Sequence, residues 1–222
     1  MTLHTYDSDG VVETRLVHDV QRCATTLLVD AMAAADPEPE ALARFRDFLV
    51  AALHHHHRAE DTDLWPLLLE VAPELAEPLA GLSAEHERLD AALDRLAGTD
   101  LGRGGPDAVA TVAEVHDLVH GHLDREEPVL FPALQERLPA PTWDGFSQRT
   151  VAAAPQTGIE ILAGLLHEVG DDRSVAVVLR HVPAEARALV PAMRAETRVV
   201  LDALGVAGRL PELVGALERG GG

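Results

Sequence analysis

The sequence predicts an all-α protein, in which an antiparallel four-helix bundle is followed by a C-terminal helical extension. Composition is the first reason: 47% of the 222 residues are hydrophobic but only 3% are aromatic. The core must therefore consist mostly of Ala, Leu and Val, and a chain rich in Ala, Leu, Arg and Glu is typical of helices. The second reason is the spacing of apolar residues, which follows one helical face in four long stretches joined by short connections.

Each expected helix is bounded by residues that start or stop helices. Before the first, Asp7-Ser8-Asp9-Gly10 offers an N-cap, and after it Asp36-Pro37-Glu38-Pro39 ends the pattern, because proline cannot continue a helix. Pro73 and Pro78 bracket the turn before the third helix, and the glycine-rich stretch 98–106 precedes the fourth. The four helices are expected at residues 11–35, 40–70, 79–97 and 107–138.

The clearest boundary in the chain is Leu138-Pro139-Ala140-Pro141. It divides a bundle at residues 11–138 from a helical annex at residues 142–217, for which composition indicates no role. Shorter helical patterns in the annex are expected near residues 143–154, 158–169, 174–182 and 184–204.

Charge and composition exclude several classes of function. The chain has 18 basic and 37 acidic residues, a formal charge of −19, so it lacks the basic face that nucleic-acid binding needs. Every basic residue is Arg, which excludes a catalytic or phosphate-binding lysine. The single cysteine, Cys23, excludes a disulfide, a cysteine-rich zinc site and an iron–sulfur cluster within one chain.

No targeting signal stands out in the sequence. No apolar run is long enough to cross a membrane, and the stretch from Met1 to Gly10 has no features of an export signal. We therefore expect a soluble, cytoplasmic protein with neither a membrane nor a nucleic acid as its partner.

An eleven-residue pattern occurs twice, at residues 56–66 and 122–132. Both copies share a His, a Glu four residues later, a further acid after that Glu, and then Leu, an aromatic residue and Pro. Residues i and i+4 lie on one face of a helix, and each His–Glu pair falls in line with the apolar stripe of its helix. The four side chains expected to point into the bundle are His56, Glu60, His122 and Glu126.

Burying an imidazole and a carboxylate on each of two helices is costly unless something compensates them. Buried His–Glu hydrogen bonds are the simple alternative, but duplication of the whole pattern favours two metal ions bridged by Glu60 and Glu126. His86 lies on the apolar stripe of the third helix. His18 is the histidine of the first helix, and its separation from His86 along the chain is nearly the same as the separation between the two copies of the repeat. The candidate metal ligands are His18, His56, Glu60, His86, His122 and Glu126.

The number and type of these ligands indicate the metal. Two histidines and two bridging carboxylate oxygens give each ion four ligands, and a bridging solvent molecule gives a fifth. Octahedral iron would keep one position open for a small molecule. Imidazole and carboxylate without thiolate suit iron, with manganese as an alternative, whereas a structural zinc site is more often closed and tetrahedral.

The residues around these candidates resemble the hemerythrin-like (HHE cation-binding) domain family over residues 11–138. The stretch Val17-His18-Asp19-Val20-Gln21-Arg22 is similar to the first-helix motif of that family, and Leu53–Asp61 is similar to the second. The resemblance implies a four-helix bundle that holds two non-haem irons with an oxo or hydroxo bridge. It also implies that the protein binds O2, or reacts with O2, peroxide or nitric oxide.

Two positions depart from the family pattern. Relatives often have a second histidine four residues after the one on the third helix, where this chain has Asp90, which either ligates through oxygen or leaves its iron more open. In relatives, the fourth-helix residue that bridges the two irons is often an Asp one residue further along. In this chain the expected bridge is Glu126. His57, next to His56, is a further candidate because related proteins sometimes use this position.

The other histidines and the cysteine are expected to have no role in the metal site. Cys23 is expected to be a small core residue. The histidines expected to be solvated or packed against a neighbour are His54 and His55. The pair expected to face solvent is His116 and His120. The histidines with no partner of matching spacing are His4, His167 and His181.

Three functions fit the expected site. The first is binding, sensing or protection, in which the open iron position takes up O2, peroxide or nitric oxide. The alternative is an enzyme, a diiron oxidase or oxygenase whose small organic substrate lies between the bundle and the annex. The third is an iron or redox sensor whose annex contacts a partner protein. A pocket between bundle and annex, lined by polar side chains and reaching the metals, would favour the enzyme.

Overall fold

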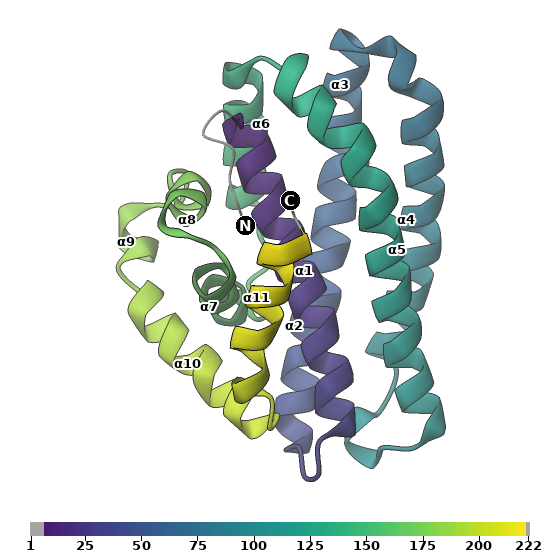
Figure 1. Ribbon diagram of the computed structural model, residues 1–222, viewed down its shortest axis with the longest axis vertical. Helices are drawn as coiled ribbons and strands as arrows, with labels where there is room; N and C mark the ends of the chain where they lie inside the picture. Colours follow the sequence, from purple (N-terminus) through teal and green to yellow (C-terminus); the bar gives the residue numbers. More distant parts are fainter. Residues whose placement is uncertain (1–6, 221–222) are drawn as a thin grey trace.

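The computed structural model describes residues 7–220, and every regular element in this range is a helix. Four long helices lie side by side as an antiparallel bundle (Figure 1). They are α1 (Asp9–Ala33), α2 (Pro39–Ala59), α4 (Ala76–Ala97) and α5 (Pro106–Glu136). The all-α fold predicted from the sequence is therefore confirmed, as is the N-cap of the first helix, where the Ser8 side chain accepts from the N–H of Val11.

The second predicted helix, 40–70, is interrupted in the structure. A π-helical turn at Glu60–Leu64 separates α2 from α3 (Trp65–Val71), and the residue after the turn bonds the carbonyl five residues back. Pro66 favours this interruption because it has no N–H to continue the α-helical ladder. Such turns shift the register of side chains along a helix and are frequent at functional sites.

The annex consists, within the described residues, of short helices: α6 (Ala140–Ala152), α7 (Ile159–Val169), α8 (Asp172–Leu179), α9 (Ala184–Arg187), α10 (Val190–Ala203) and α11 (Leu210–Gly220). The single helix expected at 184–204 is divided into α9 and α10, because Pro191 lacks the N–H that a continuous helix would need. The helix α11 was not predicted.

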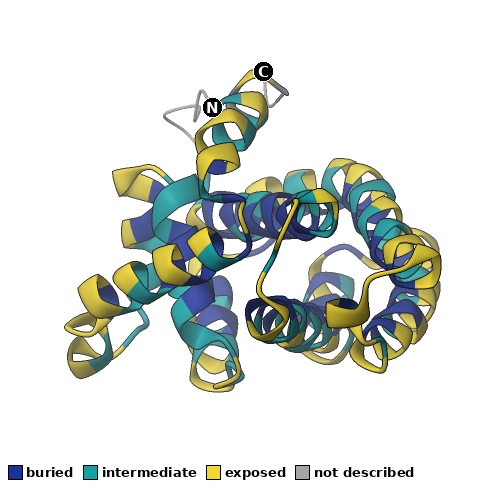
Figure 2. Cartoon of the chain, turned by 90° about the horizontal axis from the view of Figure 1, so that it is seen from below, coloured by how far each residue is buried: buried dark blue, intermediate teal, exposed yellow. Residues whose placement is uncertain are grey.

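The annex covers one side of the bundle. Figure 1 and the view from below in Figure 2 show its helices on the side of α1 and α2, away from α4 and α5. α1 contacts α5 within the bundle and α7 and α8 of the annex. On α2, Arg44 forms ion pairs with Glu160 of α7 at 2.8 Å and Glu196 of α10 at 2.7 Å, which join the annex to the bundle.

The apolar core has two parts. The larger includes Phe45, Leu49 and Leu93 and extends into the annex, and the smaller surrounds Trp65 and Trp143. Along α2, α4 and α5 a layer of buried histidines and carboxylates lies between these two parts. No helix among the described residues is long and apolar enough to cross a membrane.

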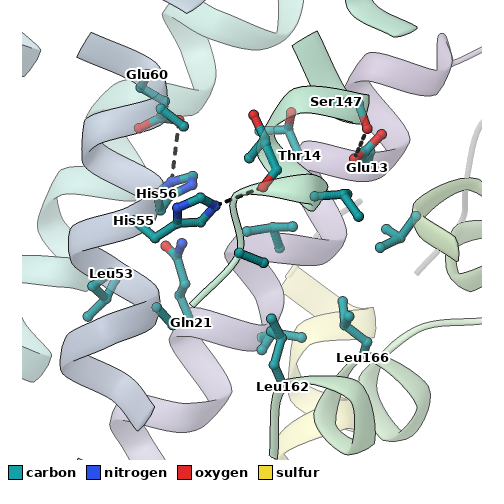
Figure 3. A pocket seen from close by; sticks show the side chains of 18 of the residues that line it. Glu13, Thr14, Gln21, Leu53, His55, His56, Glu60, Ser147, Leu162 and Leu166 are labelled. Atoms are coloured by element: carbon teal, nitrogen blue, oxygen red, sulfur yellow. Dashed lines mark hydrogen bonds and ion pairs between the residues drawn. The ribbon is translucent and has the colours of Figure 1, made fainter. Parts of the chain in front are cut away.

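A cavity of about 160 Å³ lies where the bundle meets the annex. Its walls come from α1, α2, α6, α7 and α8, and they are mainly apolar (Figure 3). His56 and Glu60 belong to its lining. The cavity therefore reaches from the annex to the polar layer of the bundle.

Candidate metal centre

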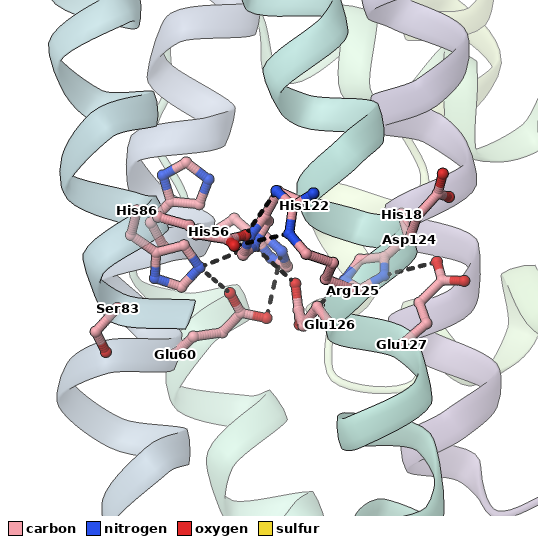
Figure 4. A network of polar contacts seen from close by, with 12 residues as sticks. His18, His56, Glu60, Ser83, His86, His122, Asp124, Arg125, Glu126 and Glu127 are labelled. Carbon is pink, nitrogen blue, oxygen red and sulfur yellow. Dashed lines mark hydrogen bonds and ion pairs between the residues drawn. The ribbon is translucent and has the colours of Figure 1, made fainter. Parts of the chain in front are cut away.

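The six ligands predicted from the sequence converge in the middle of the bundle. Figure 4 shows their side chains turned toward one another from all four long helices and from the start of the π turn. Of the six, five are fully buried, and the sixth, His56, has a side chain that is 14% exposed. The structure thus brings together His18, His56, Glu60, His86, His122 and Glu126.

The carboxylate of Glu60 lies between two histidines on different helices. Its Oε1 is 3.3 Å from Nε2 of His56, and its Oε2 is 3.5 Å from Nε2 of His86. One oxygen therefore faces each histidine, which is the arrangement that a bridging carboxylate needs.

The carboxylate of Glu126 has the same arrangement with the other two histidines. Its Oε1 is 3.7 Å from Nε2 of His18, and its Oε2 is 3.0 Å from Nε2 of His122. Ligand atoms of four residues (His18, His56, Glu60 and Glu126) lie within 4.8 Å of one another, and so do those of His86, His122 and Glu126. The two groups share Glu126, so the geometry has room for two cations, one next to each pair of histidines.

Several atoms at the centre have no hydrogen-bond partner among the described residues. They are Nε2 of His18 and His56, Oε2 of Glu60 and both carboxylate oxygens of Glu126. A buried polar atom left unpaired costs about 1–3 kcal/mol, and all of these atoms are metal-ligand types. A cation in the centre would satisfy them, so the residues present fit the metal that the sequence predicts.

Carboxylates behind three of the histidines determine which ring nitrogen faces the centre. Nδ1 of His18 is 3.1 Å from Glu127, that of His86 is 3.0 Å from Asp61, and that of His122 is 2.9 Å from Glu85. An ionised carboxylate only accepts hydrogen bonds, so each Nδ1 carries the proton and each Nε2 offers its lone pair. The lone pairs of His86 and His122 then face each other at 3.0 Å, a contact that requires a cation or a proton between them.

These supporting carboxylates are themselves held in place. Glu127 accepts from Arg22 at 2.5 Å, Asp61 from the Ser83 hydroxyl at 2.6 Å, and Glu85 from Arg125 at 2.7 Å. The sequence-based prediction gave none of the three carboxylates a role. A signal for two of them was present, because Asp61 and Glu127 are the acids that follow the ligand Glu in both copies of the repeat. Glu85 has no such signal.

Burial and neighbouring charges adapt the site to a cation. Burial, together with His18, holds the pKa of His56 well below its usual range, and burial with His57 and His122 lowers that of His86 to about 4. Both rings are therefore neutral near pH 7, as ligands must be.

The two central carboxylates differ from each other. Burial and the neighbouring Glu126 charge raise the pKa of Glu60. Burial also opposes ionisation of Glu126, but His18 and His122 outweigh it and hold the pKa of that carboxyl below its usual range. Two ionised carboxylates at this depth therefore need added positive charge.

The two further candidate residues, His57 and Asp90, contact each other. Nδ1 of His57 is 2.7 Å from the Asp90 carboxylate, and its buried ring stacks on that of His86 with centroids 4.5 Å apart. Asp90 thus lies behind His57, as Asp61 lies behind His86. Neither residue belongs to the two groups of converging ligand atoms.

The remaining histidines lie outside the centre. Nε2 of His55 is 3.1 Å from the carbonyl of Thr150 on α6, and His54 lies beside Asp90 and Asp94, so both pack against neighbours as expected. His116 is partly exposed beside Asp117, but the expectation that His120 faces solvent is wrong. That residue lies on α5, and its half-buried ring packs against α1, with Nε2 3.3 Å from the Thr25 hydroxyl.

The last predicted positions are the isolated histidines and the cysteine. His167 and His181 lie in the annex, and His4 lies outside the described residues. Cys23 is a buried core residue, as expected. Burial and the nearby Asp19 raise the pKa of its thiol to about 12, so it is not a thiolate at neutral pH.

Comparison with known proteins agrees with the geometry of the centre. The family model of the hemerythrin HHE cation-binding domain matches residues 13–134, more than half of the chain and all six converging residues. No curated protein and no solved structure matches the chain. The chain belongs to the hemerythrin HHE cation-binding family.

Proposed function

We propose that this protein holds two iron ions in its bundle and that the diiron centre binds or reacts with O2, peroxide or nitric oxide. The observation that carries the proposal is the arrangement of Glu60 and Glu126, each with one oxygen directed to each pair of histidines. Neutral imidazoles and carboxylates without thiolate are the ligands that suit iron, with manganese as the alternative.

In this proposal each residue has a definite task. His18 and His56 would hold one ion and His86 and His122 the other, and Glu60 and Glu126 would offer an oxygen to each. The carboxylates behind His18, His86 and His122 keep the Nε2 of these three rings directed inward and make each ring a stronger donor. Iron bound here would supply redox chemistry toward a small oxidant, and the surrounding helices would exclude bulk water.

A second candidate function is an oxidase or oxygenase that uses O2 on a small organic substrate. The observation that favours it is the cavity between bundle and annex, because His56 and Glu60 are part of its wall. The polar lining expected for a substrate pocket is found only in part, since most of the wall is apolar. In this alternative, the annex would hold the substrate next to the metal.

Two measurements test the proposal and its alternative. Anaerobic loading with ferrous iron, followed by removal of excess metal and elemental analysis, should give two irons per chain, and one zinc per chain with no iron would contradict it. Mixing the loaded, reduced protein with O2 should then give a reversible spectral change if the protein is a binder. Irreversible O2 consumption that an added organic compound accelerates would identify the oxidase.

A further inference from the structure

The cavity at the annex has the size of a small ring compound. Its volume of about 160 Å³ is close to that of engineered apolar cavities that take up benzene. The end that faces the annex is apolar and includes Leu162 and Leu166 of α7 and Val178 of α8. A ligand of about six to eight non-hydrogen atoms would fill this space.

The opposite end of the cavity carries an unused hydrogen-bonding group. Gln21 is only 6% exposed, and its Oε1 has no hydrogen-bond partner among the described residues. Figure 3 shows its amide turned toward His55 and His56. The buried hydroxyl of Thr150, also in the lining, likewise has no partner in the described part of the chain. Buried polar groups of this kind are normally satisfied, so a ligand with one hydrogen-bonding group would complete the site.

The charges around the cavity select against ionic ligands. Its described lining contains no arginine, and the chain has no lysine, so an anion would meet carboxylates and no cationic side chain. Among the carboxylates of the described lining, only Glu60 has an oxygen without a hydrogen-bond partner, and that oxygen, Oε2, faces Nε2 of His86 in the centre at 3.5 Å, so an ammonium group would find little to bind. Both oxygens of Glu13 are taken, one by the N–H of Trp143 at 3.1 Å and one by the Ser147 hydroxyl at 2.6 Å, and those of Glu60 face the histidines of the centre.

We propose that this cavity binds a small, neutral, mainly apolar molecule with a single hydroxyl or carbonyl group, and that Gln21 holds this group beside His56. The apolar part of the molecule lies against α7 and α8, and its polar end points to the bundle. That the bound molecule meets iron rests on the function proposed above, whereas its binding to the cavity does not.

Four ring compounds of similar size distinguish the proposed ligand class. Calorimetric titration of the iron-loaded full chain should show that benzyl alcohol binds one per chain and at least tenfold more tightly than toluene, benzylamine or benzoate. A tenfold ratio corresponds to about 1.4 kcal/mol. Tighter binding of the amine or the acid, or no binding of benzyl alcohol at millimolar concentration, would overturn the proposal.

A matched pair of variants tests the role of Gln21. Gln21→Leu keeps the size of the side chain but removes the amide, so it should weaken benzyl alcohol binding about tenfold and leave toluene binding unchanged or stronger. Gln156→Leu, at an exposed position outside the lining, should change neither. Equal benzyl alcohol affinity in the two variants would refute the role of Gln21, and the ranking on the unmodified protein remains decisive if a variant does not fold.

Metal content measured on the same samples separates this proposal from the proposed function. Two irons per chain without benzyl alcohol binding would refute the cavity proposal and leave the diiron centre intact. Binding of benzyl alcohol to a chain that takes up no iron would refute the diiron function and support the cavity proposal.

Discussion

The two halves of the centre come from one repeated pattern but have different surroundings. The half formed by His18 and His56, here the cavity-side half, borders the space under the annex through His56. The half formed by His86 and His122, here the inner half, is flanked by the rings of His57 and Trp65. The repeat thus determines which ligand types are present, and the neighbours of each half determine what can approach it.

Exposure of the histidines shows the same difference. The side chain of His56 is 14% exposed, whereas those of the other three central histidines, His18, His86 and His122, are 0%, 1% and 2% exposed, so the difference is due to His56. A small molecule that enters from the cavity should therefore reach the cavity-side half first.

The largest effect is expected where the halves are joined. Glu126 faces a histidine of each half, so Glu126→Ala should remove a ligand from both and reduce the bound iron from two per chain to none. Elemental analysis after anaerobic loading measures this. Glu136→Ala, at an exposed position on the same helix, is the control and should keep two irons. Two irons with an unchanged spectrum in Glu126→Ala would show that this carboxylate is not a bridge.

Removal of the metal should destabilise the whole bundle, because the cations compensate its buried carboxylates. A ligand present at 1,000 times its Kd stabilises the folded state by about 4 kcal/mol per site, so chelation should lower the Tm by roughly 10 °C or more. Calorimetry of the loaded and chelated protein checks this. Equal Tm values would contradict a centre that contributes to stability.

Histidine variants should distinguish the two halves. His18→Ala and His122→Ala should each lower the iron content from two per chain to one, because each removes a terminal ligand from one half only. Azide should still change the spectrum of His122→Ala, which keeps the cavity-side iron, and should have little effect on His18→Ala. Equal azide responses would show that access does not depend on the cavity.

The difference between repeat and surroundings also explains what the sequence could predict. His56, Glu60, His122 and Glu126 follow from the i, i+4 spacing on an apolar stripe, a local property of one helix. Glu85 could not be identified as the support of His122, because it lies on another helix and precedes a different ligand. The cavity depends on how the annex packs on α1 and α2, and the sequence predicted most of the annex helices but not their packing.

The supporting carboxylates give a smaller, selective effect on the inner half. Loss of a carboxylate behind a ligand histidine typically weakens metal binding 10–100-fold. Asp90 contacts His57, which is not one of the converging ligands but stacks on the ligand His86, so Asp90→Asn should weaken the inner iron by less than tenfold, below that range, and leave the cavity-side iron unchanged. Asp94→Asn is the matched control, since Asp94 lies beside His54 but not His57. Competition with a chelator measures both affinities, and equal values in the two variants would assign Asp90 no role.

The smallest effect concerns Glu13, a buried carboxylate of the cavity wall that is held by protein donors rather than by a cation. Burial is the main cause that raises its pKa, against the opposing hydrogen bonds from Ser147 and Trp143. The neutral form therefore persists to a higher pH in the folded state than in the unfolded state. The stability that comes from the raised pKa of Glu13 is fully present below the ordinary carboxyl pKa. It is lost as the pH rises through the higher pKa of this carboxyl in the folded state.

Glu13→Gln keeps an acceptor for Trp143 and a polar partner for Ser147 but cannot ionise. As the pH rises above the ordinary carboxyl pKa, the unmodified protein should therefore lose stability relative to Glu13→Gln, by about 1.4 kcal/mol for each pH unit between the two pKa values. Thermal unfolding of both proteins at matched iron content measures this difference, because the titration of the metal centre is common to both. If the two curves of Tm against pH ran parallel, Glu13 would be ionised equally in the folded and unfolded states, and the cavity wall would carry a full charge that disfavours an apolar ligand.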